Sequence, residues 1–408
     1  MRPSAIVAAS RLSTSLIRVS YADGHVSNFN QSWLRHHCLC AQCTQPSSGQ
    51  RLAVRPPACP AELIKATPDK LTVVWQGGKH VSEFDPQWLR RHCYSKETLA
   101  KERNALVALG APSKIHHVDY STLTSKDPKA LHGWMSGFVN HGVCLLSNVP
   151  TSDEALLSVV ALTGCSPSHQ LYGETFKVET TSDPINVAYS TEALEPHQDL
   201  AYYEAPPGVQ ILHCQEFDAS IQGGESTFVD GLAAAELLRL RDAKAFDVLT
   251  RVPATFQKDH VRRANPAKMY FQRPHIATHA ATQDVVAIFW APPFEGPLRV
   301  DASLVDAYYG AREAFANVLK DDVLWEKHGF KFRLQPGQAV MFNNRRYLHG
   351  REAFTPGRRK LHGCYLEMDS FLNRTRVLEW MLGGAPDSVV GWGLSGLNEA
   401  RAGIVNHR

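Results

Sequence analysis

The sequence predicts an α+β fold in which a small β-rich domain precedes a larger double-stranded β-helix, or jelly roll. From about residue 115 onward, many short strand patterns are separated by Gly and Pro turns, and only a few segments have helical periodicity. Before residue 105, two alternating strand patterns each turn at glycine. We therefore expect one domain at 1–105 and a second at 115–408, the latter ending in helices.

The predicted N-terminal domain contains a short internal repeat. "SLIRVSYADGHVSNF" and "DKLTVVWQGGKHVSEF" both alternate, and each precedes a matching phrase, "QSWLRHHC" at 31–38 and "PQWLRRHC" at 86–93. The phrases lie 55 positions apart. This pattern predicts two hairpins that each end in a Trp-anchored helical turn, and two copies are too few for a solenoid.

The second domain is predicted element by element. The segment 95–109 reads as a helix before a linker, and "DPKALHGWMSGFVNHGVCLLSNVP" reads as a helix, Gly142 and a buried strand. Further helices are expected at 231–249 and 301–320. Short strands are expected in "VQILHC", "GESTFVDG", "VVAIFWAPP", "KFRLQPGQAVMFNN" and "RKLHGCYLEMD".

Composition narrows the class of protein and its compartment. Hydrophobic residues make up 44% and charged residues 20%, as in ordinary globular proteins, and a net charge of +3 argues against nucleic-acid binding. No apolar run approaches the roughly 20 residues of a membrane span. Nine cysteines without a secretory leader favour a reducing compartment, which we take as the cytoplasm. Arg2, Arg11 and Arg18 keep a mitochondrial presequence open, although the strand pattern there favours a place in the fold.

Three cysteines form a compact metal-binding pattern. "HHCLCAQC" holds Cys38, Cys40 and Cys43, and three thiolates from one loop can bind Zn²⁺ with one tetrahedral position left. Three unrelated thiols in one loop are the alternative. The candidates for the fourth ligand are His36, His37, His80 and Cys93. A site with four protein ligands is structural, because no position remains for water or substrate.

His197 and Asp199 suggest a second metal site. In an extended segment, residues i and i+2 point to the same side, so both could bind one ion. A simple His–Asp hydrogen bond is the alternative, and the pair taken alone favours it. His349, after a Pro-Gly turn and an apolar strand, can supply a third ligand at a strand end. Two His and one carboxylate form the facial triad of non-haem Fe(II) oxygenases.

Arg359 lies ten residues past His349 on the next predicted strand. A guanidinium pairs bidentately with a carboxylate and can anchor a dicarboxylate cosubstrate. Arg358 and Lys360 flank it, so a surface charge is the alternative. Alternation places Arg359 and Tyr365 on one strand face, which favours an inward position.

These motifs together resemble a known family. "WLRHHCLCAQC", "YGETF", "INVAYSTEALEPHQD", "PPGVQILHC", "GGESTFVDG" and "FNNRRYLHGR" are similar to the γ-butyrobetaine hydroxylase and trimethyllysine hydroxylase group of 2-oxoglutarate-dependent oxygenases. The resemblance runs almost end to end and is closer to γ-butyrobetaine hydroxylase. It implies O₂-dependent hydroxylation of γ-butyrobetaine to L-carnitine in carnitine biosynthesis. Trimethyllysine or another trimethylammonium compound, such as a phosphonate, is the alternative substrate.

The resemblance also implies roles for individual residues. Zinc would be bound by Cys38, Cys40, Cys43 and His80, and iron by His197, Asp199 and His349. Arg359 and Ser226 would bind 2-oxoglutarate, with ascorbate as a supporting reductant. The substrate would contact Tyr172, Phe176, Asn186, Tyr189 and Tyr365, in which the aromatic rings form a cage for the trimethylammonium group. The family further implies a homodimer, and "RTRVLEWML" would suit a dimerisation helix.

Two departures concern the substrate end of the site. Leu200 follows the H-x-D aspartate where the animal enzyme has Tyr, and "FWAPPFEG" lacks the Asn residues of that enzyme. Phe176 also stands in place of a Trp. We expect Tyr202 or Tyr203 to replace the lost ring and Trp290 to rebuild the other wall.

Overall fold

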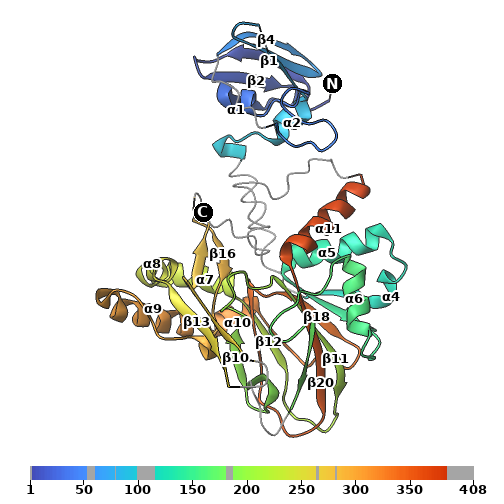
Figure 1. Ribbon diagram of the computed structural model, residues 1–408, viewed down its shortest axis with the longest axis vertical. Helices are drawn as coiled ribbons and strands as arrows, with labels where there is room; N and C mark the ends of the chain where they lie inside the picture. The colour runs from blue at the N-terminus through green and yellow to red at the C-terminus, as the bar shows by residue number, and fades with distance from the viewer. Residues whose placement is uncertain are drawn as a thin grey trace. The chain divides into compact units, whose positions relative to one another are not determined.

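The computed structural model describes residues 2–52, 60–78, 80–98, 115–180, 187–262, 266–280 and 283–383. These residues fall into two compact units, one before residue 105 and one after it (Figure 1). Most of the helix predicted at 95–109 lies outside the described residues. The predicted α+β class, with a jelly roll after a small β-rich unit, is confirmed.

The N-terminal unit contains two three-stranded antiparallel sheets, each followed by a short helix. Alternating residues of both sheets, including Val19, Phe29, Val73 and Trp75, form one buried core. Trp33 and Trp88 lie in the helices as predicted, but each sheet has one strand more than a hairpin. The elements are β1 (Ile6–Arg11), β2 (Leu16–Tyr21), β3 (Val26–Asn30), α1 (Gln31–His36), β4 (Ala61–Thr67), β5 (Lys70–Trp75), β6 (Val81–Phe84) and α2 (Pro86–Arg91).

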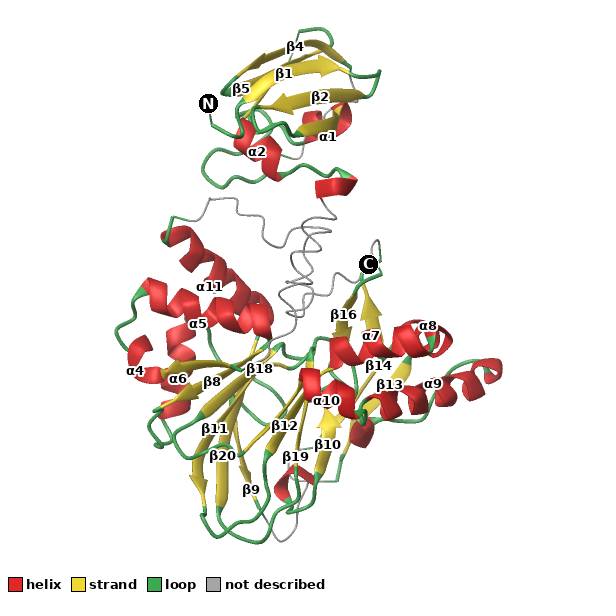
Figure 2. Ribbon diagram, turned by 180° about the vertical axis from the view of Figure 1, so that it is seen from behind, coloured by secondary structure: helices red, strands yellow, loops and turns green. Residues whose placement is uncertain are grey.

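The larger unit is built on two sheets that enclose the jelly-roll interior (Figure 2). One sheet has six strands in the order β7-β8-β18-β11-β20-β9, and the other has four in the order β10-β19-β12-β17. Only the β7–β8 pair is parallel among these described strands. The bounds are β7 (His116–Asp119), β8 (Val143–Ser147), β9 (Thr175–Glu179), β10 (Leu194–His197), β11 (Val209–Phe217), β12 (Ser226–Asp230), β17 (Gly329–Phe332), β18 (Ala339–Asn343), β19 (Tyr347–Arg351) and β20 (Arg359–Leu366).

Helices cover the six-stranded sheet, and a separate subdomain extends the four-stranded side. A buried apolar cluster joins helices α5, α6 and α11 to this sheet. These elements are α4 (Tyr120–Leu123), α5 (Pro128–His141), α6 (Ala155–Thr163) and α11 (Met368–Met381). The subdomain comprises α7 (Gly231–Arg241), α8 (Ala243–Arg251), β13 (Ala254–Asp259), β14 (Lys268–Arg273), β15 (Ile276–Thr278), β16 (Val285–Ile288), α9 (Val305–Val318) and α10 (Asp322–His328). The 3₁₀ turns among the described residues of the larger unit are η1 (Val187–Tyr189), η2 (Pro292–Phe294) and η3 (Ala302–Leu304).

Local sequence signals explain where the helices begin and end. The Asp127 carboxylate accepts from the Ala130 amide at 3.1 Å and Pro128 opens α5, while Gly142 at φ 76° ends it. The buried strand β8 follows directly, as predicted. The segment predicted as one helix at 231–249 forms two, because Asp242 ends α7 and caps α8.

Candidate active site

His197 and His349 face each other on neighbouring strands. The antiparallel pairing of β10 with β19 puts them directly opposite, and their ring centroids lie 4.4 Å apart. Both side chains are buried. His349 lies in the middle of β19, not at a strand end as the sequence suggested.

Asp199 reaches the two histidines from a turn and not from an extended segment. Strand β10 ends at His197, and Leu200 has φ of 60°, a left-handed conformation that bulky residues rarely adopt. Asn344 secures this turn, because its side chain accepts from the Asp199 amide and donates to the Asp199 carbonyl, both at 3.0 Å. The turn therefore returns the carboxylate to the side of His197.

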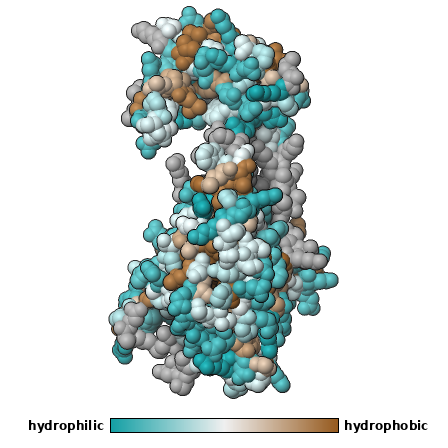
Figure 3. Space-filling view, turned by 90° about the vertical axis from the view of Figure 1, so that its right-hand side faces the viewer, coloured by the Kyte–Doolittle hydropathy of each residue, from teal (hydrophilic) through white to brown (hydrophobic). Residues whose placement is uncertain are grey.

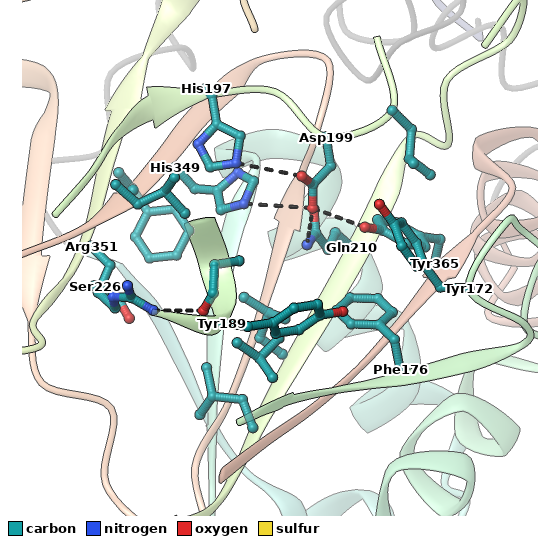
Figure 4. A pocket seen from close by; sticks show the side chains of 18 of the residues that line it. Tyr172, Phe176, Tyr189, His197, Asp199, Gln210, Ser226, His349, Arg351 and Tyr365 are labelled. Carbon is teal, nitrogen blue, oxygen red and sulfur yellow. Dashed lines mark hydrogen bonds and ion pairs between the residues drawn. The ribbon is translucent and has the colours of Figure 1, made fainter. Parts of the chain in front are cut away.

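The three side chains converge on one point (Figure 4). Asp199 Oδ1 lies 3.4 Å from His197 Nε2, and Asp199 Oδ2 lies 3.7 Å from His349 Nε2. One ligand atom from each residue lies within 4.8 Å of the others. These separations suit a single cation bound at roughly 2 Å from each donor atom.

The protonation of the site favours a divalent cation. Burial lowers the pKa of His349 to about 3, so its imidazole is neutral at neutral pH. Burial opposes ionisation of Asp199, but the contacts with His197, His349 and Tyr365 together outweigh it and hold the pKa of this carboxyl below its ordinary value. The His349 imidazole and the Asp199 carboxylate are thus in the forms that bind a metal.

Neighbouring side chains orient the ligands. His197 Nδ1 lies 2.9 Å from the Glu195 carbonyl, which places the ring proton there and leaves Nε2 for a metal. Gln210 Nε2 and Tyr365 Oη both donate to Asp199 Oδ2 at 2.8 Å. Sequence reasoning missed Gln210 in this position, although a polar residue inside the apolar strand "VQILHC" was a signal for it.

Arg359 is a buried cation without a protein carboxylate. Its side chain is 6% exposed, and no ion pair is formed by it within the described residues. The guanidinium lies 5.6 Å from the Phe217 ring and 5.7 Å from the Phe354 ring. Burial, followed by the charge of Arg351, lowers the pKa of Arg359 to about 10, which still leaves it charged. A buried unpaired charge is costly, so this position fits an anionic ligand such as the far carboxylate of 2-oxoglutarate.

Arg351 and Ser226 line the same pocket as Arg359. They are opposite each other in the β12–β19 pairing. Unlike Arg359, Arg351 has hydrogen-bond partners in the protein. Its guanidinium donates to the carbonyls of Ala188, Ser190 and Glu192 at 2.9, 2.7 and 2.7 Å. It therefore holds the segment that carries Tyr189.

An aromatic wall lies beside the three ligands. Tyr172, Phe176, Tyr189 and Tyr365 all line the pocket that contains His197 and Asp199. The Phe176 and Tyr365 rings stack at 5.1 Å with an interplanar angle of 27°, and Tyr172 lies 6.4 Å from Phe176. Asn186 lies outside the described residues.

The structure also tests the predicted replacements in this wall. Tyr202 lines the pocket with Phe294, which sequence reasoning did not identify, and their rings meet edge to face at 5.3 Å. Tyr203 is not among the described pocket-lining residues, and its hydroxyl accepts from the Leu171 amide at 2.8 Å. The prediction for Trp290 is wrong, because that ring is buried in the core 5.1 Å from Phe315, away from the described lining.

Residues 102–365 match the taurine catabolism dioxygenase TauD, TfdA family, and residues 10–67 match a gamma-butyrobetaine hydroxylase-like N-terminal domain. The chain is 31% identical to gamma-butyrobetaine dioxygenase from Pseudomonas sp. (strain AK-1), with 89% of this chain and 94% of that protein covered.

The chain belongs to this family of Fe(II)/2-oxoglutarate-dependent dioxygenases.

Two relatives whose names differ from gamma-butyrobetaine dioxygenase are also similar to this chain. The dioxygenase str8 from Strobilurus tenacellus is 31% identical, with 88% of each chain covered. Trimethyllysine dioxygenase from Meyerozyma guilliermondii is 25% identical, with 89% of this chain and 93% of that protein covered. Family membership therefore establishes the class of reaction, and the substrate needs a separate argument.

The N-terminal unit of this dioxygenase contains a Cys₃His cluster. His80 Nε2 lies 3.3, 3.7 and 3.6 Å from the sulfurs of Cys38, Cys40 and Cys43. Four thiol and imidazole ligands at this spacing fit a tetrahedral Zn²⁺. Among the described residues, His37 is not part of this cluster, and its ring stacks on Trp33 at 4.2 Å.

The described helices of the dioxygenase include none that is long and apolar enough to cross a membrane. On the visible face of the larger unit, hydrophilic and intermediate side chains prevail over apolar ones (Figure 3).

Proposed function

We propose that this dioxygenase hydroxylates a small trimethylammonium substrate, and that γ-butyrobetaine, converted to L-carnitine, is that substrate. The observation that carries the proposal is the aromatic wall beside the triad. Tyr172, Phe176, Tyr189 and Tyr365 line one pocket with the proposed iron ligands His197, Asp199 and His349. The similarity to gamma-butyrobetaine dioxygenase supports the same substrate.

Aromatic rings suit this substrate because a quaternary ammonium has no N–H to donate. Its attraction to ring faces is the available means of recognition, and it strengthens when water is excluded. Phe176 stacks on Tyr365, and both rings line the same pocket as Tyr172 and Tyr189 (Figure 4). We therefore assign these rings to the trimethylammonium head and not to core packing alone.

The chain's own residues prepare the site for catalysis. His197, Asp199 and His349 would hold the iron, and Gln210 and Tyr365 fix the carboxylate through hydrogen bonds. Fe(II) and 2-oxoglutarate, when bound, supply the O₂-derived oxidant that hydroxylates a substrate C–H bond. The protein contributes position, because the aromatic wall must place one methylene next to the metal.

Arg359 is the proposed anchor of the cosubstrate. Its guanidinium lacks a described carboxylate partner, whereas that of Arg351 is used to hold the 188–192 segment. Ser226 lines the same space and can donate its hydroxyl to the same carboxylate. Cosubstrate and substrate would then approach the triad from different walls of one pocket.

The anion end of the substrate favours a second candidate. Among the described pocket-lining residues the cations are Arg351 and Arg359, and both are assigned to other tasks. Leu200 and Phe294 line this pocket with apolar surface, and the stretch at 289–296 lacks the Asn residues of the animal γ-butyrobetaine enzyme. The carboxylate of γ-butyrobetaine thus has no assigned cation among the described residues, and a substrate with a different anionic end, trimethyllysine or a trimethylammonium phosphonate, is the second candidate for the same chemistry.

The deciding experiment measures succinate release with Fe(II) and 2-oxoglutarate across γ-butyrobetaine, trimethyllysine and a trimethylammonium phosphonate. We expect γ-butyrobetaine to give the highest kcat/KM and to yield carnitine. Higher kcat/KM for either other compound would assign the second candidate. Turnover of none of the three, by protein that holds iron and binds 2-oxoglutarate, would refute the trimethylammonium proposal.

A neutral analogue separates charge recognition from shape. The analogue of the preferred substrate with a tert-butyl group in place of the trimethylammonium should bind far more weakly. Loss of one cation–π contact in Tyr189→Leu should cost about 1–2 kcal/mol, or about fivefold to thirtyfold in affinity for the cation. Equal weakening of both ligands would mean that Tyr189 contributes only shape.

We also propose a homodimer in which helix α11 contributes to the interface. Trp380 and Met381 near its end are 58% and 53% exposed. Light scattering should give the mass of two chains, and Trp380→Asp should shift the mass toward one chain. A monomeric wild type over the working concentration range would refute this assignment.

A further inference from the structure

The N-terminal unit is assembled from two copies of one motif. Strands β1–β3 with helix α1 form the first copy, and β4–β6 with α2 form the second. Helix α1 at Gln31–His36 and helix α2 at Pro86–Arg91 lie 55 positions apart, and their N-caps Asn30 and Asp85 obey the same offset.

The contacts inside the two copies are nearly identical. Trp33 stacks on His37 at 4.2 Å, and Trp88 stacks on His92 at 4.3 Å. His37 and His92 each direct Nδ1 at the carbonyl of their Trp at 2.7 Å. The duplication is therefore visible in side-chain geometry and not only in strand order.

The Cys₃His cluster links the two copies, and a second contact mirrors it. Cys38 from the first copy lies 3.3 Å from His80 Nε2 of the second copy. At the same offset, Cys93 Sγ from the second copy lies 3.3 Å from His25 Nε2 of the first. Both sulfurs are buried, with Cys38 2% and Cys93 4% exposed.

Hydroxyl groups occupy the remaining ligand positions of the second site. The spacing of Cys38, Cys40 and Cys43 is repeated by Cys93, Ser95 and Thr98. Thr98 Oγ1 lies 3.5 Å from Cys93 Sγ and 3.0 Å from Ser95 Oγ. All four positions of the zinc cluster thus have spatial counterparts, in which two thiols are replaced by hydroxyls.

We propose that Cys93 and His25 form a second metal site, the pseudosymmetric counterpart of the Cys₃His cluster, which takes a soft monovalent cation such as Cu(I). One thiolate and one imidazole are too few for structural Zn²⁺, which almost always has four ligands of the Cys, His or carboxylate type. Soft thiolate donors select Cu(I), which accepts low coordination numbers. The sulfur–nitrogen separation equals that between Cys38 and His80, so an ion held at the bond angle of the zinc cluster would contact both Cys93 and His25.

The surroundings of the pair favour its metal-binding forms. Burial opposes ionisation of Cys93, but hydrogen bonds with Ser27, Thr98 and Ser95 together outweigh it and lower the pKa of the thiol. Burial also lowers the pKa of His25, and the charge of Arg90 adds to this effect. The alternative is a thiol–imidazole hydrogen bond that never takes a metal.

A copper titration distinguishes the metal site from the hydrogen bond. Full-length, zinc-loaded protein is titrated anaerobically with Cu(I) and desalted, and copper and zinc per chain are measured. Wild type should retain one copper equivalent more than Cys93→Ser or His25→Gln. Cys165→Ser, which removes a half-buried thiol from the larger unit, should match wild type. Equal copper in wild type and Cys93→Ser overturns the proposal, whether or not copper displaces zinc from the cluster.

A gain of zinc tests the equivalence of the two sites without copper. Ser95→Cys combined with Thr98→Cys should raise the zinc content from one to two per chain. Adding Cys93→Ser to this variant should return it to one. A folded double variant that still holds one zinc would overturn the correspondence, and if the variant does not fold, the copper titration decides.

Discussion

Tyr365 Oη donates to Asp199 Oδ2 at 2.8 Å while the ring of Tyr365 stacks on Phe176 at 5.1 Å. One side chain therefore connects the proposed iron ligand to the proposed trimethylammonium cage. Its position on β20, whose first residue is Arg359, places the cosubstrate anchor on the same strand. Variants that remove only the hydroxyl, or the whole ring, separate these two roles of Tyr365.

Tyr365→Phe should weaken iron binding while preserving the cage. The variant keeps the ring but removes a hydrogen bond to a charged group, and such supporting contacts typically contribute about tenfold to 100-fold to metal affinity or activity. The Fe(II) concentration for half-maximal activity should rise, with little change in substrate KM at saturating iron. Tyr365→Leu should raise both. A Tyr365→Phe enzyme with unaltered iron dependence would remove Tyr365 from the positioning role.

Asp199→Ala should abolish Fe(II)-dependent hydroxylation without unfolding the protein, because the triad loses its only carboxylate. Glu195→Ala is a matched control, since that side chain is exposed and only its backbone carbonyl contacts His197. Circular dichroism and product formation are measured on both variants. Retained hydroxylation in Asp199→Ala would exclude the facial-triad assignment.

Strand periodicity predicted part of this site well. Alternation along β20 placed Arg359, Leu361 and Tyr365 on one face, and all three line the pocket. The cysteine spacing likewise predicted three of the four residues of the metal cluster. Both signals are local, because period-two geometry and loop spacing depend only on neighbouring residues.

Other features depend on partners far away in the sequence. Asn344 supports Asp199 from 145 positions away, and no local pattern encodes that contact. The sequence did not predict the turn at Leu200, because Leu rarely adopts positive φ. Trp290 illustrates the opposite error, since an aromatic residue near site motifs was assigned to the pocket and instead fills the core.

Arg359→Lys should raise the KM for 2-oxoglutarate at least about tenfold, because a hydrogen bond to a charged group contributes about 1.5–3 kcal/mol. Lys keeps the charge but loses the planar fork. Arg358→Lys is the control, since its side chain is 77% exposed and pairs with Glu216. An unchanged KM in Arg359→Lys would place the cosubstrate anchor elsewhere, with Arg351 the next residue to test.

His80→Ala should lose the structural zinc, whereas Cys93→Ala should keep it, because His80 and not Cys93 lies within reach of all three cluster sulfurs. Metal analysis of purified protein after iron removal gives the comparison. Cys40→Ser should also lower the unfolding temperature, since metal-binding energy at such a site is folding energy. The reverse zinc result would assign the fourth ligand to Cys93.

Gly363 explains how Phe176 comes so close to β20. The two residues pair across β9 and β20, and a Cβ at Gly363 would lie 2.5 Å from Phe176 Cζ and 2.9 Å from Leu212 Cδ2. No side chain fits there without displacement of the Phe176 ring. Glycine at this position therefore allows the ring to lie over the strand that carries Tyr365.

Gly363→Ala should consequently displace the Phe176 ring of the cage, without changing any residue that touches iron or 2-oxoglutarate. The displaced ring should raise the KM for the trimethylammonium substrate by about fivefold to thirtyfold, the effect of losing a contact of about 1–2 kcal/mol. The KM for 2-oxoglutarate and the iron dependence should stay constant. Gly310→Ala in α9 is the control, because a Cβ there meets nothing within 4 Å. If Gly363→Ala leaves the substrate KM unchanged and Phe176→Leu does the same, Phe176 is core packing and the cage consists of the tyrosines alone.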